Sequence, residues 1–232
     1  MLAFIKKMLS PHTSELSFSQ CGEDRIVKFV FDVLRIQHTK YLDIGSHHPR
    51  RWNNTYLSYL SGGSGVLVEP NPHWCSLIRK ERPRDVCLAA GLAGEALSAV
   101  PFYIMKSDAL CTFSRREAER MVAECDEEIR EVKEIEVLTP DAILSTHFKG
   151  GLNYVSLDVE GWEMEILEAF DLKRNRPEVF CVETLSYAVD GSGKKSLGVI
   201  EFMKQQEYMV FADTHINTIF VDRSCWENLG RS

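Results

Sequence analysis

The sequence predicts an α/β fold with a largely parallel central sheet, on three observations. Short apolar runs typical of strands alternate along the chain with amphipathic stretches typical of helices, which is the pattern of βαβ units. Several of the runs are almost continuously apolar, as expected for strands covered by helices on both faces. The chain has 232 residues, of which 44% are hydrophobic and 26% charged, so it can bury the core of one large domain.

The first part of the chain is predicted to form one helix and three strands. Residues 22–35 carry apolar side chains at helical spacing, with two acids in the first turn and Ser19 as the expected N-cap. The strands are predicted from short apolar runs between turn signals, at 40–45, 64–70 and 85–90.

The stretch from about 99 to 136 is less regular and is predicted to be an insertion. Its short apolar runs predict strands at 99–105, 109–114 and 134–138. A charged segment with apolar residues at helical spacing predicts a surface helix over 115–134. With no internal repeat or linker, the chain is predicted to be one domain over residues 1–232, with an N-terminal extension at 1–18.

The second part returns to regular alternation. Thr139 is the expected N-cap of a helix with proline at its first position. The remaining strands and helices are predicted in the order strand 153–161, helix 162–170, strand 177–184, helix 196–206, strand 207–213 and strand 217–223. The last two strands would form a hairpin, which puts an antiparallel member into the sheet.

Composition narrows the class of protein. Lysine plus arginine is 27 and aspartate plus glutamate is 34, so the net charge is −7, which argues against sequence-independent nucleic-acid binding. The seven cysteines contain no CxxC pair and are predicted to be free thiols in a reducing compartment. The N-terminus does not read as a signal peptide, and no apolar window is long enough to span a membrane. A cytoplasmic protein is therefore expected.

Acids end four of the predicted strands: Asp43, Glu69, Asp158 and Glu183. Ligands of open parallel sheets bind outside the carboxyl ends of the strands, so these side chains are expected to surround one site. After Asp43 the sequence reads "IGSHHPR", with one glycine, Gly45. A dinucleotide-binding loop would carry two more glycines to cradle a pyrophosphate.

Glu69 lies 26 residues after Asp43, where an acid hydrogen-bonds the hydroxyls of a ribose. A ribose acid with a single glycine and no phosphate cradle indicates a nucleoside ligand without phosphates. S-adenosylmethionine is such a ligand. Its sulfonium and ammonium groups are positive, so the acids would hold it by charge and hydrogen bonding.

Six segments in this order resemble the FkbM family of S-adenosylmethionine-dependent methyltransferases and span about residues 19 to 222. They are "SQCGEDRIV" (19–27), "YLDIGSHHPRRWNNTYL" (41–57), "GVLVEPNP" (65–72), "NYVSLDVEGWEMEIL" (153–167), "PEVFCVET" (177–184) and "FADTHINTIFVD" (211–222). The resemblance implies a class I methyltransferase, Rossmann-like fold: a seven-stranded, mostly parallel sheet with one antiparallel strand and helices on both faces. It also implies O-methylation of a sugar, glycan or natural product. The 99–136 insertion departs from the family pattern, and because insertions on the ligand side of this fold usually shape the acceptor pocket, it is expected to do so here.

The resemblance also implies how the donor is held. By position, Asp43, Gly45 and Ser46 would lie along its methionine end, Glu69 would hold its ribose, and Ala90 would flank its adenine.

The remaining family positions lie around the reacting end. Gln20 and Glu23 would close over the donor from the N-terminal helix, and Asp158 would face the reacting centre. Asn54 would either hydrogen-bond the donor or cap a helix.

Methyl transfer to oxygen requires an aligned acceptor and a group that takes the hydroxyl proton. Asp158, His47 and His48 are the main catalytic candidates and His215 is a further one, because a carboxylate or an imidazole with a pKa of about 6.5 can act as a base at neutral pH. A divalent metal is an alternative that the spacing does not test. Its candidate ligands are Asp158, Glu160, Glu183 and His215.

Two other functions remain as alternatives. An NAD-dependent sugar-nucleotide enzyme would share the fold, but the missing glycines argue against it. A non-catalytic nucleotide-binding protein would share it too, but the intact strand-end acids argue against that. The segment "GSGKK" at 191–195 lacks the glycine and the hydroxyl residue of a phosphate-binding loop and is predicted to be a flexible loop.

Overall fold

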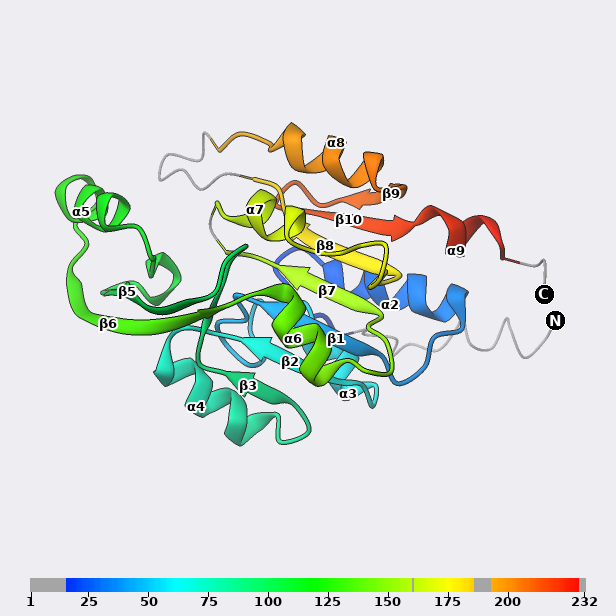
Figure 1. The fold of residues 1–232 in the computed structure, drawn as a ribbon, viewed down its shortest axis with the longest axis horizontal. Coiled ribbons are helices and arrows are strands. Elements are labelled where there is room, and N and C mark those ends of the chain that lie inside the picture. The colour runs from blue at the N-terminus through cyan, green and yellow to red at the C-terminus, as the bar shows by residue number, and fades with distance from the viewer. Residues whose placement is uncertain (1–15, 160, 186–192, 230–232) are drawn as a thin grey trace.

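The computed structural model describes residues 16–159, 161–185 and 193–229 (Figure 1). Its main sheet contains the strands β1 (Lys40–Ile44), β2 (Ser64–Val68), β3 (Val86–Leu88), β7 (Tyr154–Leu157), β8 (Val179–Glu183), β9 (Tyr208–Asp213) and β10 (Asn217–Asp222). The strand order is β3-β2-β1-β7-β8-β10-β9. Adjacent strands from β3 to β8 run parallel, whereas β10 pairs antiparallel with both β8 and β9. The predicted seven-stranded, mostly parallel sheet and its C-terminal hairpin are thus confirmed.

Helices cover both faces of this sheet. They are α2 (Glu23–Leu34), α3 (Tyr56–Leu60), α4 (Pro72–Glu81), α6 (Pro140–His147), α7 (Glu163–Glu168) and α8 (Leu197–Gln205), and a short α9 (Arg223–Glu227) follows β10. Successive side chains of a strand point to opposite faces. Leu42 and Ile44 of β1 therefore pack with α6, α7 and α8, while Tyr41 packs with α2, α3 and α4. Both faces need apolar residues, which explains the continuous apolar runs.

A smaller sheet lies beyond the carboxyl ends of the main strands. It consists of β4 (Gly91–Leu92), β5 (Leu97–Met105) and β6 (Ile129–Leu138), and between β5 and β6 come a 3₁₀ turn η1 (Asp108–Leu110) and α5 (Arg115–Glu124). The arrowheads of β2 and β7 point toward the side of the molecule where α5 and β5 lie (Figure 1). The predicted insertion therefore stands on the ligand side of the sheet.

Two predictions within this insertion are wrong. The surface helix expected over 115–134 ends at Glu124, because residues from Ile129 onward form an antiparallel ladder with β5. The helix was expected because the apolar residues Val122, Cys125, Ile129 and Val132 recur at helical spacing. Cross-strand pairing overrides that pattern here. The strand expected at 109–114 begins as the 3₁₀ turn, and only Thr112 makes a β-bridge, to Tyr103.

A third correction concerns the start of α2, where the N-cap is Gly22, at φ 89°, and not Ser19. The Ser19 hydroxyl still accepts hydrogen bonds from the backbone N–H groups of Gly22 and Asp24, at 3.1 and 3.3 Å. Most of the predicted extension at 1–18 and part of the loop at 191–195 lie outside the described residues.

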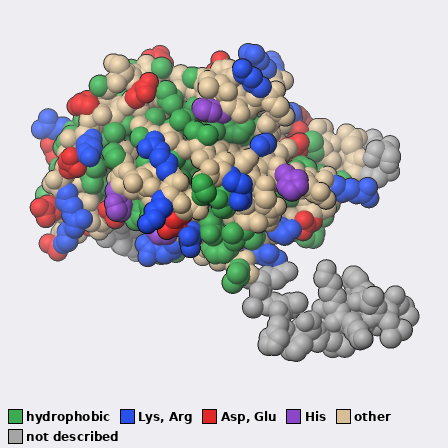
Figure 2. Space-filling model, turned by 90° about the horizontal axis from the view of Figure 1, so that it is seen from below, with side chains coloured by type: hydrophobic (Ala, Val, Ile, Leu, Met, Phe, Trp, Pro, Cys, Tyr) green, Lys and Arg blue, Asp and Glu red, His purple; other side chains and the backbone are tan. Residues whose placement is uncertain are grey.

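The surface carries charges of both signs. On the face seen in Figure 2, lysine and arginine side chains lie among acidic and apolar ones. Within the described ranges, no helix combines the length and the hydrophobicity that a membrane crossing requires.

Candidate active site

Two adjoining cavities open at the carboxyl ends of the parallel strands. The larger has a volume of about 560 Å³ and the smaller about 310 Å³. Both are lined by Leu110, Cys111, Thr112, Glu183 and Leu185, so the two cavities meet along these residues. Seven residues predicted from the sequence line the larger cavity: Gln20, Gly45, His47, Glu69, Ala90, Asp158 and Glu183.

Gly45 forms the turn at the end of β1. Its φ is +78°, and its N–H donates to the carbonyl of Val68 at 3.0 Å. A Cβ at this position would lie 1.7 Å from the carbonyl oxygen of Asp158, which no side chain tolerates. Glycine is therefore required both for the backbone conformation and for the close approach of the chain after β7.

Glu69 directly follows β2 and is only 5% exposed. The backbone N–H groups of His47 and Asn71 donate to its two carboxylate oxygens, at 2.8 and 2.7 Å. Burial raises the pKa of Glu69 to about 7, although these two hydrogen bonds oppose the shift. Each oxygen keeps a further lone pair, so the carboxylate is held in place with capacity for two ligand hydroxyls.

Asp158 follows β7, Glu183 ends the neighbouring strand β8, and both face the same cavity. Leu157 pairs with Val182 in the register of β7 and β8, which places the two acids side by side. Their side chains are hydrogen-bonded to one another, and burial raises the pKa of Asp158 to about 6. The pair is a source of negative charge at the junction of the two cavities.

One end of the larger cavity is apolar. Its walls here are Val68, Ala90, Leu92, Phe102 and Phe113. The rings of Phe102 and Phe113 lie 4.7 Å apart, between centroids, and close this end. A flat apolar group would be desolvated there, and Val68 of this wall directly precedes Glu69 in the chain.

Four residues predicted to bind the donor do not line either cavity. Asp43 is buried behind Gly45, where it accepts hydrogen bonds from the Thr55 hydroxyl at 2.6 Å and the Asn53 amide at 3.1 Å. Asn54 donates to the Ser156 hydroxyl at 3.3 Å. These contacts make Asp43 a support for the β1 turn.

Ser46 and Glu23 are the other two. Ser46 is buried, and its hydroxyl has no hydrogen-bond partner among the described residues. Glu23 accepts hydrogen bonds from the Thr214 hydroxyl at 2.6 Å and the Asn217 amide at 3.1 Å, which ties α2 to the β9–β10 turn.

The candidate histidines differ in position. His47 lines the larger cavity, and the centroid of its ring lies 4.6 Å from that of Trp74. Burial lowers the pKa of His47, so its side chain is neutral at pH 7. His48 uses Nδ1 to accept the backbone N–H groups of Arg50 and Arg51, each at 3.0 Å. His215 is exposed in the β9–β10 turn, and neither cavity includes it.

The candidate metal ligands do not form a cluster among the described residues. Over the described parts of the chain, no three His, Cys, Asp or Glu side chains are grouped so that they could hold a metal ion. Glu160, one of its candidate ligands, lies outside the described residues.

A buried arginine supports the turn, and the sequence did not reveal it. All five N–H groups of Arg82 donate hydrogen bonds, although its side chain is fully buried. The acceptors are Asp85 at 2.8 Å, Asn53 and Thr55 at 3.0 Å each, Tyr41 at 3.2 Å and the carbonyl of Pro49 at 3.3 Å. Asn53 and Thr55 are also the residues that donate hydrogen bonds to Asp43. Arg82 therefore stabilises the β1 turn at Gly45 indirectly, by holding the two side chains that hold Asp43.

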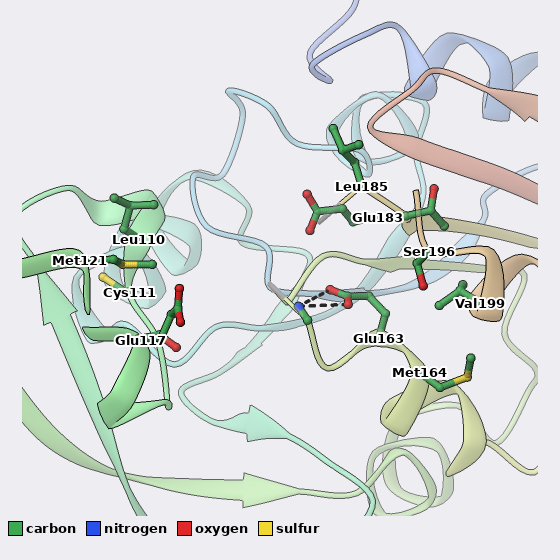
Figure 3. Close-up of a pocket in the computed structure, with 13 residues that line it drawn as sticks. Leu110, Cys111, Glu117, Met121, Glu163, Met164, Glu183, Leu185, Ser196 and Val199 are labelled. Atoms are coloured by element: carbon green, nitrogen blue, oxygen red, sulfur yellow. Dashed lines mark hydrogen bonds between the residues drawn. The ribbon is translucent and has the colours of Figure 1, made fainter. Parts of the chain in front are cut away.

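The smaller cavity lies between the insertion and the main sheet. Figure 3 shows Leu110, Cys111, Glu117 and Met121 on one side, and Glu163, Met164, Glu183, Ser196 and Val199 on the other. Glu163 accepts the backbone N–H groups of Val159 and Gly161, each at 3.1 Å. Within the described part of the chain, no lysine or arginine lines this cavity.

Solved structures of several methyltransferases are similar to the chain at low identity. A TehB-like SAM-dependent methyltransferase from Corynebacterium glutamicum has 10% identity and a TM-score of 0.43, over 95% of this chain and 96% of that one. The precorrin-6y C5,15-methyltransferase of Geobacter metallireducens has 14% identity and a TM-score of 0.40, over 84% and 85%. An O-methyltransferase from Bacillus cereus in complex with SAH has 12% identity and a TM-score of 0.39, over 95% and 87%.

No curated protein matches the chain. The methyltransferase FkbM domain, in contrast, matches it over residues 43–221, from the acid of β1 to the end of β10. This match covers well over half of the sequence and includes Gly45, Glu69, Asp158 and Glu183. The chain therefore belongs to the FkbM methyltransferase family.

Proposed function

We propose that the protein transfers the methyl group of S-adenosylmethionine to a hydroxyl oxygen of a sugar, glycan or natural product. One observation carries the proposal: Gly45, Glu69 and Asp158 meet at the ends of three neighbouring strands, in one cavity of about 560 Å³. Bound there, S-adenosylmethionine would supply a methyl carbon already activated by its sulfonium.

The residues of the larger cavity fit this donor. Glu69 would accept the two ribose hydroxyls with its remaining lone pairs. The apolar end beside Ala90 would enclose the adenine. Asp158 and Glu183 would face the cationic end, where their negative charge favours a sulfonium and an ammonium.

Asp158 is the best-placed group to take the acceptor proton. It faces the junction of the two cavities, and its raised pKa of about 6 makes it a stronger base than an ordinary carboxylate while leaving it ionised at pH 7. His47 lies next to Glu69, on the ribose side of the proposed donor, and His48 is engaged by the loop backbone.

The smaller cavity would receive the acceptor, so that the insertion shapes the acceptor site. Its lining combines the carboxylates Glu117, Glu163 and Glu183 with hydroxyl and apolar side chains. Carboxylates accept hydrogen bonds from hydroxyl groups and repel anions. This favours an uncharged, hydroxyl-bearing acceptor over a phosphorylated or carboxylated one.

The seven free cysteines support a cytoplasmic location.

Calorimetric titration with S-adenosylmethionine tests the donor site. We expect micromolar binding by the wild type and an affinity at least tenfold lower for Glu69→Ala, a loss of about 1.4 kcal/mol. Glu168→Gln, which changes an exposed acid of α7, serves as the control and should bind like the wild type. If folded wild-type protein binds NAD and not S-adenosylmethionine, the proposal fails and the dinucleotide alternative replaces it.

The affinity for S-adenosylmethionine should depend on pH through Asp158. Below about pH 6 its carboxyl group is protonated and loses the charge that faces the sulfonium, so the affinity should fall as the pH decreases, by up to about tenfold in total. S-adenosylhomocysteine lacks the sulfonium charge and should show a shallower dependence. Glu69 also titrates, with a pKa of about 7, but it would contact the ribose that both ligands share. Equal slopes for the two ligands would contradict the placement of Asp158.

A further inference from the structure

Two cysteines that the proposed methyl transfer does not use lie in contact behind the larger cavity. Cys75 is in the first turn of α4, and Cys87 is the middle residue of β3. Their Sγ atoms are 2.7 Å apart. Both side chains are buried, with 1% and 5% of their surface exposed.

The geometry is close to that of a disulfide. An S–S bond is about 2.05 Å long, so the sulfur atoms would have to approach by only about 0.65 Å. The strand that carries Cys87 is at the edge of the main sheet, where it pairs with β2 alone. An edge strand can move by a fraction of an ångström without disturbing a second neighbour.

The two thiols are chemically unequal. The hydrogen bond from Cys87 lowers the pKa of Cys75 against the opposing effect of burial, and the positive charge of Arg79 lowers it further. Arg79 is held there because it donates a hydrogen bond to the carbonyl of Cys87 at 2.9 Å. The pKa of Cys87 is raised, first by the same hydrogen bond between the thiols. Since the thiolate is the nucleophile, Cys75 would react first.

The other five cysteines offer no comparable pair. All seven lie in the described part of the chain, and there no other two cysteines are in hydrogen-bonding contact. Cys21 is exposed, and Cys181 is buried in the core beside Tyr154.

We propose that Cys75 and Cys87 are a site of reversible oxidative modification, at which a hydroperoxide converts the two thiols to a disulfide. The Cys75 thiolate attacks one peroxide oxygen, which forms a sulfenic acid and releases hydroxide. Cys87 then loses its proton and attacks the sulfenic sulfur, which forms the S–S bond and releases a second hydroxide. With the two thiol protons, the hydroxides become water, so with hydrogen peroxide two thiols and one peroxide yield one disulfide and two waters.

Mass spectrometry of the full-length protein tests the proposal. Reduced protein would be held in hydrogen peroxide, unfolded in N-ethylmaleimide and digested. We expect the peptides that contain Cys75 and Cys87 to be joined, with a loss of two hydrogen masses that dithiothreitol reverses. The bond closes a short loop between α4 and β3, so the midpoint of thermal unfolding should rise by roughly 5–10 °C in the oxidised protein.

A second arm removes burial as a barrier to the oxidant. Denatured, reduced protein would be refolded with oxidised glutathione and analysed in the same way. Cys125→Ser keeps both sulfur atoms and should form the link, whereas Cys75→Ser should leave Cys87 alkylated. Recovery of both cysteines as alkylated thiols after treatment with hydrogen peroxide, or of either joined mainly to another cysteine in either arm, would overturn the proposal. Neither arm involves a methyl donor, so the result is independent of the proposed function.

Discussion

Replacement of Asp158 by asparagine is expected to slow methyl transfer by about 10²- to 10⁴-fold, the range typical of a lost general base. The substitution keeps the size of the side chain at the junction of the two cavities but removes its ability to take a proton. Asparagine still hydrogen-bonds Glu183, so the fold should be retained. The change should therefore appear in kcat, with the affinity for S-adenosylmethionine reduced by no more than about tenfold.

The measurement is the initial rate of methyl transfer to the best acceptor in a panel of uncharged hydroxyl compounds, together with calorimetric donor affinity. Glu168→Gln again controls for the loss of one negative charge, and its rate should equal that of the wild type. A rate for Asp158→Asn within threefold of wild type would remove Asp158 from the reaction. His47, the other catalytic candidate that lines the larger cavity, would then be tested by the same comparison.

The sequence predicted the main sheet because each of its strands is a short apolar run with a turn signal at one end. The same logic predicted where the ligand side lies, since acids and one glycine follow the strands there. Gly45, Glu69 and Asp158 could be placed together because the ends of parallel strands share one edge of a sheet. Their position depends on the direction of the strands and needs no knowledge of side-chain packing.

Other features depend on packing and could not be predicted in this way. The segment from Ile129 to Glu134 carries alternating charges that suit an exposed helix, and only its partner β5 makes it a strand. The helix α3 was considered only as one of two roles for Asn54, and its N-cap is Thr55. The helix α4 was not predicted, although it begins with the Asn71 cap and a proline, a recognisable start signal. The pairing of Cys75 with Cys87 depends on how that helix lies on β3.

The contacts of Asp43 at the site itself also depend on packing and could not be predicted from the sequence. Its place at the end of β1 was predicted, but not that its carboxylate is already engaged by Asn53 and Thr55. Those two side chains are in turn held by an arginine from the far end of α4, and local sequence contains no sign of this contact. The support of the β1 turn is therefore a tertiary property.

Arg82→Met is expected to lower the free energy of unfolding by about 3–5 kcal/mol, which is the typical cost of removing one partner of a buried ion pair. Methionine fills much of the arginine volume but donates no hydrogen bond. Asp85 would lose its ion-pair partner in a buried environment, and Asp43 would lose the nearby positive charge that opposes the burial-driven rise of its pKa. Because a domain is stable by only about 5–15 kcal/mol, this loss should be easily measured.

Urea unfolding followed by circular dichroism provides the measurement, with an unchanged slope m showing that the same structure unfolds. Arg116→Met removes an exposed arginine of α5 and should change stability by less than about 0.5 kcal/mol. Arg82→Lys should fall between the two, since an ammonium restores the charge but cannot reach five acceptors in different directions. If Arg82→Met costs no more than Arg116→Met, the buried network does not stabilise the β1 turn. In that case Asp43 would be held by Asn53 and Thr55 alone, which leaves its carboxylate easier to redirect toward a bound donor.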